Sequence, residues 1–179
     1  MTGSEEAPAA DCAAPDRLAA FRDERIAHLV RLCARGFNRA LSLRLAARNV
    51  SFGQWVFLRI LWQEDGLTQR ELSNRASLTE PTAHAALLRM ERSGLVTRRA
   101  GDDDRRQRRV FLSERGRALR AELEPLAIEA NEVALAGLDA GQREALRAAL
   151  LGILNNLQAD EAAHGARGLR IPSTRSWSG

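Results

Sequence analysis

The sequence contains no lysine and no tyrosine, and aromatic residues make up only 4% of its 179 positions. Its two cysteines, Cys12 and Cys33, are too few for a disulfide framework, and no CxxC or Cys/His spacing typical of zinc is present. The chain also lacks a run of 18 apolar residues and a basic-then-apolar leader. We therefore expect a soluble cytoplasmic protein that uses no metal and no cofactor.

Catalytic signatures are missing as well. The sequence has no phosphate-binding glycine loop, no nucleophile with a paired base and no carboxylate pair in a plausible cleft. The chain is therefore predicted not to be an enzyme.

Positive charge is abundant but comes from a single residue type. All 27 basic residues are arginine, which gives a net charge of +4 and a sequence pI of about 10.6. A preference for arginine over lysine across the whole chain follows from genomic base composition, but clustering does not. Eight arginines fall within one short segment, namely Arg89, Arg92, Arg98, Arg99, Arg105, Arg106, Arg108 and Arg109. This local positive field is typical of a nucleic-acid-binding surface.

Residues 67–116 contain the clearest local signals for secondary structure. Thr68 followed by Glu71 forms a capping box, which predicts a short helix from Thr68. Thr79 is a good cap for a second helix, Pro81 suits its first turn, and Gly94 ends it. The apolar residues of this second helix have the spacing of a stripe that packs on the first: Ala83, Ala86, Leu87 and Met90.

A hairpin is expected after the second helix. Residues 95–99 and 109–112 are strand candidates that flank a turn over 100–104. Residues 105–108 place long hydrogen-bonding side chains at the projecting tip, which suits DNA phosphates or a narrow minor groove.

The order and spacing of these pieces resemble the MarR family of winged helix-turn-helix regulators. The wing pattern of that family is matched by Asp104, Arg106, Val110, Leu112, Ser113 and Gly116. The recognition-helix pattern is matched by Leu78, Thr79, Thr82, Gly94, Leu95 and Val96. One aspartate usual in the wing is replaced by Gly101, and the similarity covers roughly residues 16 to 160.

The resemblance implies a mainly α fold with a small β-hairpin wing and long N- and C-terminal dimerisation helices. We expect a disordered arm over 1–15, a dimerisation helix over 16–48, and a DNA-binding domain over 51–116 with the wing at about 95–112. C-terminal dimerisation helices are expected over 113–160 and a flexible tail over 165–179. Within the DNA-binding domain, residues 52–63 are apolar on nearly every face, which predicts a buried, central helix.

A dimer of this kind would present two recognition helices to a pseudo-palindromic operator in double-stranded DNA. The expected base-edge and backbone contacts are Thr79, Glu80, Pro81, Thr82, His84 and Ala85. Glu80 could accept from a cytosine amine or simply favour the helix dipole. Arg106, held by Asp104, is expected in the minor groove, with a surface ion pair as the alternative. The expected phosphate contacts are Arg70, Arg89, Arg105 and Arg108.

Members of the MarR family, which this sequence resembles, commonly respond to a small phenolic or aromatic acid bound between the dimer helices and the winged module. Arg59 is the one charge inside an apolar helix, and it could hold a ligand carboxylate with Trp55, Trp62 and His28 as walls. The alternative is an internal carboxylate partner for Arg59, with both tryptophans in the core.

Cys33 resembles the peroxide-reactive cysteine of organic-hydroperoxide sensors in the same family. Those sensors activate the thiol with tyrosine hydroxyls, which this sequence lacks, and Cys33 falls on an apolar stripe that predicts a buried, inert thiol.

The function expected from the resemblance is that of a homodimeric, sequence-specific repressor released by a small aromatic or phenolic ligand. Two alternatives stay open. One is an oxidant-responsive repressor that senses through Cys33, and the other is a winged-helix protein-interaction module without DNA specificity.

Overall fold

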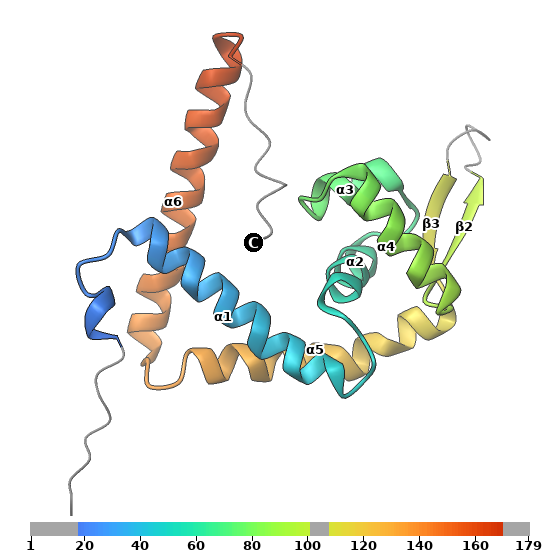
Figure 1. The fold of residues 1–179 in the computed structure, drawn as a ribbon, viewed down its shortest axis with the longest axis horizontal. Coiled ribbons are helices and arrows are strands. Elements are labelled where there is room, and N and C mark those ends of the chain that lie inside the picture. The colour runs from blue at the N-terminus through green and yellow to red at the C-terminus, as the bar shows by residue number, and fades with distance from the viewer. Residues whose placement is uncertain (1–17, 101–107, 170–179) are drawn as a thin grey trace, which may run out of the picture. The chain divides into compact units, whose positions relative to one another are not determined.

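A computed structural model of the chain describes residues 18–100 and 108–169. The chain divides into two compact units, residues 1–36 and 37–179, and helix α1 (Ile26–Ala46) crosses their boundary. The remaining elements are η1 (Ala19–Phe21), α2 (Phe52–Gln63), β1 (Leu67–Thr68), α3 (Gln69–Arg75), α4 (Glu80–Arg92), β2 (Val96–Ala100), β3 (Arg108–Leu112), α5 (Glu114–Ala134) and α6 (Ala140–Ala166) (Figure 1). The mainly helical class with a small antiparallel sheet is confirmed.

The first unit corrects the expectation of one continuous helix over 16–48. Residues 19–21 form a single 3₁₀ turn, and α1 begins only at Ile26. Leu18 and Ile26 are 70% and 64% exposed, so these side chains bury little apolar surface that could offset the cost of extending the helix. Within this unit the rings of Phe21 and His28 stack with their centroids 6.4 Å apart.

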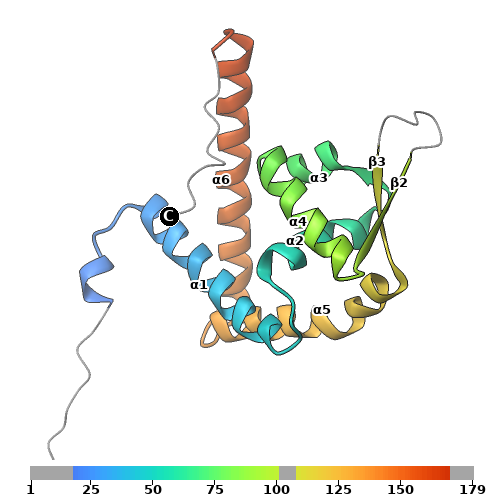
Figure 2. The same ribbon diagram turned by 45° about the vertical axis from the view of Figure 1, so that its right-hand side comes forward.

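The helix-turn-helix lies in the second unit, where α2, α3 and α4 gather around one core (Figure 2). The predicted capping box is present, since the Thr68 side chain accepts from the backbone of Glu71 and the Glu71 carboxylate accepts from the backbone of Thr68. Thr79 caps α4 as predicted, with Pro81 in its first turn. The predicted stripe of α4 is buried in full, which fixes the angle at which α4 crosses α3: Ala83, Ala86, Leu87 and Met90.

The sheet has three strands in the order β1-β3-β2, all antiparallel. The hairpin register pairs Val96 with Leu112 and Ala100 with Arg108. Each strand therefore reaches one residue further toward the wing tip than predicted, and β2 begins at Val96 rather than at residue 95. Strand β1 escaped prediction because two residues are too short to show an alternating pattern. It ties the start of the helix-turn-helix to the wing, because Leu67 pairs with Val110.

Helices α5 and α6 complete the second unit. Ser113 caps α5, and Asp139 with Gln142 forms a capping box at the start of α6. The last helix extends to Ala166, beyond the expected limit at 160, because residues 161–166 hold helix-forming alanines and no proline. Among the helices described, none is both long enough and apolar enough to cross a membrane.

Candidate nucleic-acid interface

The N-terminal half of α4 is the exposed face of the helix-turn-helix. Glu80, Pro81, Thr82, His84 and Ala85 are all exposed, whereas the stripe that lies between them on the helix is buried. The structure therefore brings the predicted contact set together on one side of one helix. Exposure of this side is what a helix that enters a major groove requires.

The two threonines of this set bond to each other. The Oγ1 atoms of Thr79 and Thr82 lie 2.8 Å apart, and the backbone N–H of Thr82 donates to Thr79 Oγ1. Thr79 thus serves the helix cap first, so its hydroxyl is less available to a base than Glu80 or His84.

His84 makes a contact that the sequence analysis missed. Its Nδ1 lies 2.9 Å from the side-chain oxygen of Gln69, the first residue of α3. The two residues are fifteen positions apart, and no local pattern marks glutamine as a partner for histidine. The link joins the two helices of the motif at their exposed side.

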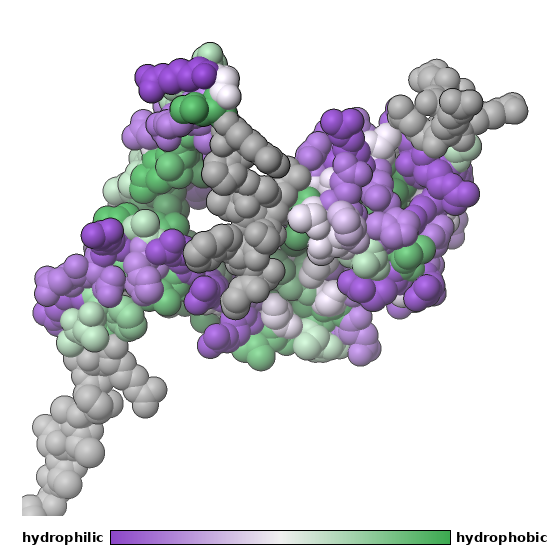
Figure 3. All heavy atoms as spheres, turned by 45° about the horizontal axis from the view of Figure 1, so that its top comes forward, coloured by the Kyte–Doolittle hydropathy of each residue, from purple (hydrophilic) through white to green (hydrophobic). Residues whose placement is uncertain are grey.

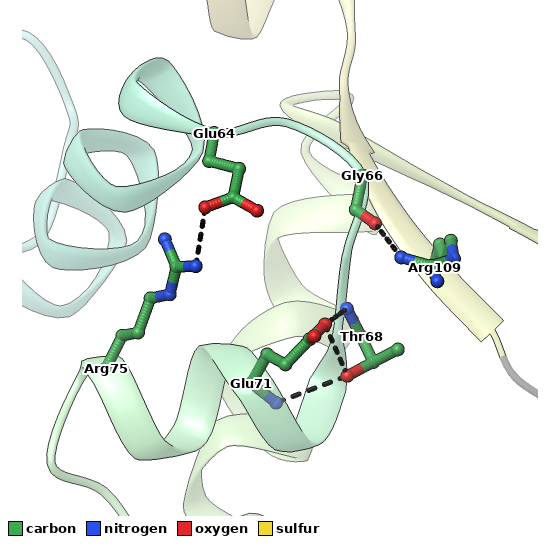
Figure 4. Close-up of polar contacts among 6 residues, drawn as sticks. All are labelled: Glu64, Gly66, Thr68, Glu71, Arg75 and Arg109. Atoms are coloured by element: carbon green, nitrogen blue, oxygen red, sulfur yellow. Dashed lines mark hydrogen bonds and ion pairs between the residues drawn. The ribbon is translucent and has the colours of Figure 1, made fainter.

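Polar contacts also fix α3 against its neighbours (Figure 4). Arg75 at the end of α3 pairs with Glu64, the residue that follows α2, and Arg109 of β3 donates to the Gly66 carbonyl at 3.0 Å. The Thr68 backbone N–H, followed by the Thr68 hydroxyl, lowers the pKa of the Glu71 carboxyl below its ordinary value of 4.5. Helix α3 is thereby held between α2 and the wing.

The hairpin is anchored to α4, and a second contact joins its own two strands. Arg98 of β2 has a side chain only 8% exposed, and its Nε lies 3.4 Å from a Glu91 carboxylate oxygen on α4. The Arg99 guanidinium lies over the Phe111 ring, 5.7 Å from its centroid. These contacts orient the strands whose ends lead to the wing tip.

Gly116 explains part of the wing pattern in physical terms. A Cβ at this position would lie 2.2 Å from the Leu95 carbonyl oxygen, so only glycine fits. The Gly116 carbonyl in turn accepts from Trp62 Nε1 at 2.9 Å. The glycine therefore lets α2, α5 and the start of β2 meet at one point.

The remaining predicted DNA contacts fall into two groups. Arg70, Arg89 and Arg108 are exposed on α3, α4 and β3. Asp104, Arg105 and Arg106 lie outside the described residues, so the expected wing pair stays a prediction from sequence.

A cavity of about 350 Å³ lies elsewhere in the second unit, between the C-terminal part of α1, α2 and α5. Its aromatic walls are Phe37, Phe52 and Trp55, and its polar groups include Arg59. The complete lining is Phe37, Asn38, Leu41, Phe52, Trp55, Val56, Arg59, Ala127, Ala130 and Asn131. Two of the four predicted ligand residues are thus brought together.

Arg59 corrects the picture of α2 as buried on every face. The side chain is exposed, and within the described ranges it forms no ion pair, so the expected internal carboxylate is absent. One face of α2 borders the cavity, which is why a charge is tolerated there.

The other two predicted ligand residues are placed differently. Trp62 packs edge-on against Trp55 with centroids 5.6 Å apart and donates to Gly116, while His28 belongs to the first unit. Asn38 and Asn131 were missed, because neither breaks an apolar run as Arg59 does.

Cys33 is exposed, so the prediction of a buried thiol is wrong for this chain. Within the described residues, no group of three or more histidine, cysteine, aspartate and glutamate side chains is placed to hold a metal ion.

A hairpin that follows two helices packed at their apolar stripes defines a winged helix-turn-helix protein. Comparison with known proteins gives the family. The model of the MarR family matches residues 50–107. The HTH-type transcriptional regulator TtmR of Methylorubrum extorquens is 31% identical over 137 residues, which span 76% of this chain and 69% of TtmR.

Solved structures agree with the sequence comparison. A MarR transcriptional regulator from Methanosarcina mazei is 27% identical with a TM-score of 0.67, over 75% of this chain and 97% of that chain. The MarR family protein Rv2887 of Mycobacterium tuberculosis, solved with DNA, is 27% identical with a TM-score of 0.63, over 73% of this chain and 98% of that chain. Rv2887 has also been solved with p-aminosalicylic acid. The chain belongs to the MarR family and is a DNA-binding transcriptional regulator of that family.

Proposed function

We propose that this regulator is a cytoplasmic homodimer that occupies a pseudo-palindromic operator and represses transcription until a small aromatic or phenolic acid releases it. The observation that carries the proposal is the exposed face of α4, where five predicted contact residues surround a fully buried stripe. This arrangement leaves the reading face exposed, although His84 also contacts Gln69 and Thr82 contacts Thr79. The wing arginines supply the phosphate and minor-groove contacts.

The dimer is supported by α6. None of the 27 residues of this helix is buried in the single chain. Figure 3 shows apolar side chains gathered along this helix. Six large apolar residues of α6 are between 38% and 59% exposed: Leu146, Leu150, Leu151, Ile153, Leu154 and Leu157. A long apolar stripe left in water marks an association surface, and a second copy of the same helix suits it.

The effector is supported by the cavity between α1, α2 and α5. Aromatic walls suit a planar acid, and the cavity also holds two carboxamides and the Arg59 guanidinium, which has no ion pair among residues 18–100 and 108–169. The carboxylate of the acid would bond to Arg59. Rv2887 in complex with p-aminosalicylic acid shows that a relative accepts such a compound. Release requires only a difference in affinity between two dimer geometries. The acid must bind more tightly to the geometry that does not fit DNA than to the geometry that does.

The test is a titration of the duplex upstream of the chain's own gene against a scrambled duplex at several salt concentrations. Preferential binding with a steep salt dependence is expected, and Arg108→Ala should lower the salt slope by about one. Arg120→Ala is the matched control, since this exposed arginine lies on α5 and pairs with Glu124. Equal binding to both duplexes would instead favour the protein-interaction module.

The exposure of Cys33 keeps an oxidant-responsive repressor as a second candidate. In the same assay, loss of DNA binding on addition of an organic hydroperoxide, abolished by Cys33→Ser, would favour it over the aromatic acid. Unchanged binding under peroxide would exclude it.

A further inference from the structure

The first turns of α4 offer hydrogen-bond acceptors where many DNA-reading helices offer arginine. Arg or Lys on guanine is the commonest specific base contact. Between Glu80 and Leu88 the helix has no arginine or lysine, and Arg89 is the first. Glu80 and His84 are the longer polar side chains on this exposed face, whereas the hydroxyls of Thr79 and Thr82 are partnered with each other.

The contact with Gln69 favours one tautomer of His84. The Gln69 side-chain oxygen lies 2.9 Å from His84 Nδ1 and accepts a hydrogen bond when Nδ1 carries the proton. In the neutral ring of that tautomer, Nε2 is an acceptor.

Glu80 and His84 lie four residues apart, so their side chains share one face of α4. Their separation along the helix axis is about 6 Å, close to two base steps of roughly 3.4 Å. An ionised carboxylate also only accepts hydrogen bonds, so Glu80 and His84 form a line of acceptors along α4. Pro81 and Ala85, equally spaced and equally exposed, form an apolar line beside it.

We propose that Glu80 and His84 read exocyclic amino groups in the major groove, and that Gln69 is the positioning residue that makes His84 an acceptor. Adenine N6 and cytosine N4 are the two donors that base edges present in that groove. The apolar line of Pro81 and Ala85 suits thymine methyl groups, so adenine in A·T pairs is the expected partner. This inference rests on the proposed entry of α4 into the major groove.

The experiment begins with selection of bound duplexes from a random-sequence library by the full-length chain. Single bases of the selected duplex are then replaced by analogues. Deoxynebularine removes the adenine amine, a 2-pyrimidinone base removes the cytosine amine, uracil removes the thymine methyl, and 7-deazaguanine removes the guanine N7 acceptor. Dissociation constants are measured by fluorescence anisotropy at fixed salt for the wild-type chain and for His84→Ala and Glu80→Ala.

Removal of the correct amine should weaken wild-type binding about tenfold. The same removal should have little further effect in the variant that lacks its acceptor, because the contact is already gone. A tenfold loss with deoxynebularine identifies adenine, and one with 2-pyrimidinone identifies cytosine. Replacement of thymine by uracil should lower affinity less than either amine removal. Replacement of guanine by 7-deazaguanine should leave affinity unchanged at the positions that His84 and Glu80 contact.

Gln69→Leu separates positioning from folding. With the acceptor removed, His84 can protonate either nitrogen, so the tenfold preference for the amine-bearing base should shrink while the melting temperature stays unchanged. Gln63→Leu at the exposed end of α2 is the matched control and should leave the preference intact.

Two results would overturn the inference, and a third would overturn its basis. Sequence-specific binding that ignores both amine-free analogues, or a large loss with 7-deazaguanine that disappears in His84→Ala, would show that these residues do not read amines. Selection that enriches no sequence would instead contradict the proposed function.

Discussion

Helices α4 and α6 both carry an apolar stripe at helical spacing, yet only one stripe is covered. In α4 all four stripe residues are buried against the chain's own core, whereas α6 has no buried residue. Periodicity therefore predicts that a helix face will be covered, but it does not tell whether the chain's own core or a partner covers it. The core of the winged module lies within one chain, whereas the proposed partner of the α6 stripe is a second copy of the chain. Substitutions in the two regions should therefore separate folding from assembly.

The largest loss of folding free energy is expected from Gly116→Ala. The added methyl would meet the Leu95 carbonyl at 2.2 Å, and backbone on both sides must move, at a cost of about 3 kcal/mol. Urea unfolding followed by circular dichroism measures the change. Gly53→Ala is the matched control, because Gly53 also lies in the first turn of a helix but has open space around it. It should stabilise the chain by up to about 1 kcal/mol.

A smaller loss, of about 2 kcal/mol, is expected from Asp65→Ala. The Asp65 carboxylate accepts from the Leu112 backbone N–H and from Arg117 Nη1, both at 2.8 Å, and so ties the end of β3 to α5. The same urea experiment measures it. Asp160→Ala on exposed α6 should change the unfolding free energy by less than about 0.5 kcal/mol, and equal losses in both variants would contradict the difference between the regions.

Glu71→Gln tests the cap of α3 and should cost at most about 1 kcal/mol at neutral pH. Because the pKa of the Glu71 carboxyl is lowered on folding, its stabilisation is fully present above the ordinary value of 4.5 and is lost as the pH falls through the lower folded value. The stability difference between wild type and variant should therefore shrink in acid. A stability difference that grows as the pH falls would contradict a lowered pKa for the Glu71 carboxyl in the folded chain.

The smallest effect on the winged module, with a large effect on assembly, is expected from the double variant Leu150→Asp and Leu154→Asp. Two charges on the exposed stripe of α6 should convert dimer to monomer in sedimentation, while hydrogen exchange of the buried α4 amides stays slow. Ala148→Asp on the opposite face of α6 is the control and should remain dimeric. Loss of α4 protection in the double variant would mean that the two regions fold as one.

Local signals in the sequence predicted most of the winged module because each boundary is fixed within a few residues. The caps at Thr68 and Thr79 and the stripe of α4 were all found where expected. The start of α1 and the exposure of Cys33 and Arg59 depend on what packs against them, which periodicity does not encode. The His84–Gln69 contact joins two helices, and no local sequence pattern in either helix indicates it.

The most direct test of the account is the spacing of the two half-sites in the selected operator. A dimer presents its recognition helices about 34 Å apart, so insertion of roughly five base pairs between the half-sites turns one half-site to the far side of the duplex. For a dimeric reader, this insertion should lower the affinity for DNA at least tenfold, to the level of a duplex with a single half-site. Unchanged affinity after the insertion would contradict a dimeric reader and indicate that one winged module binds alone.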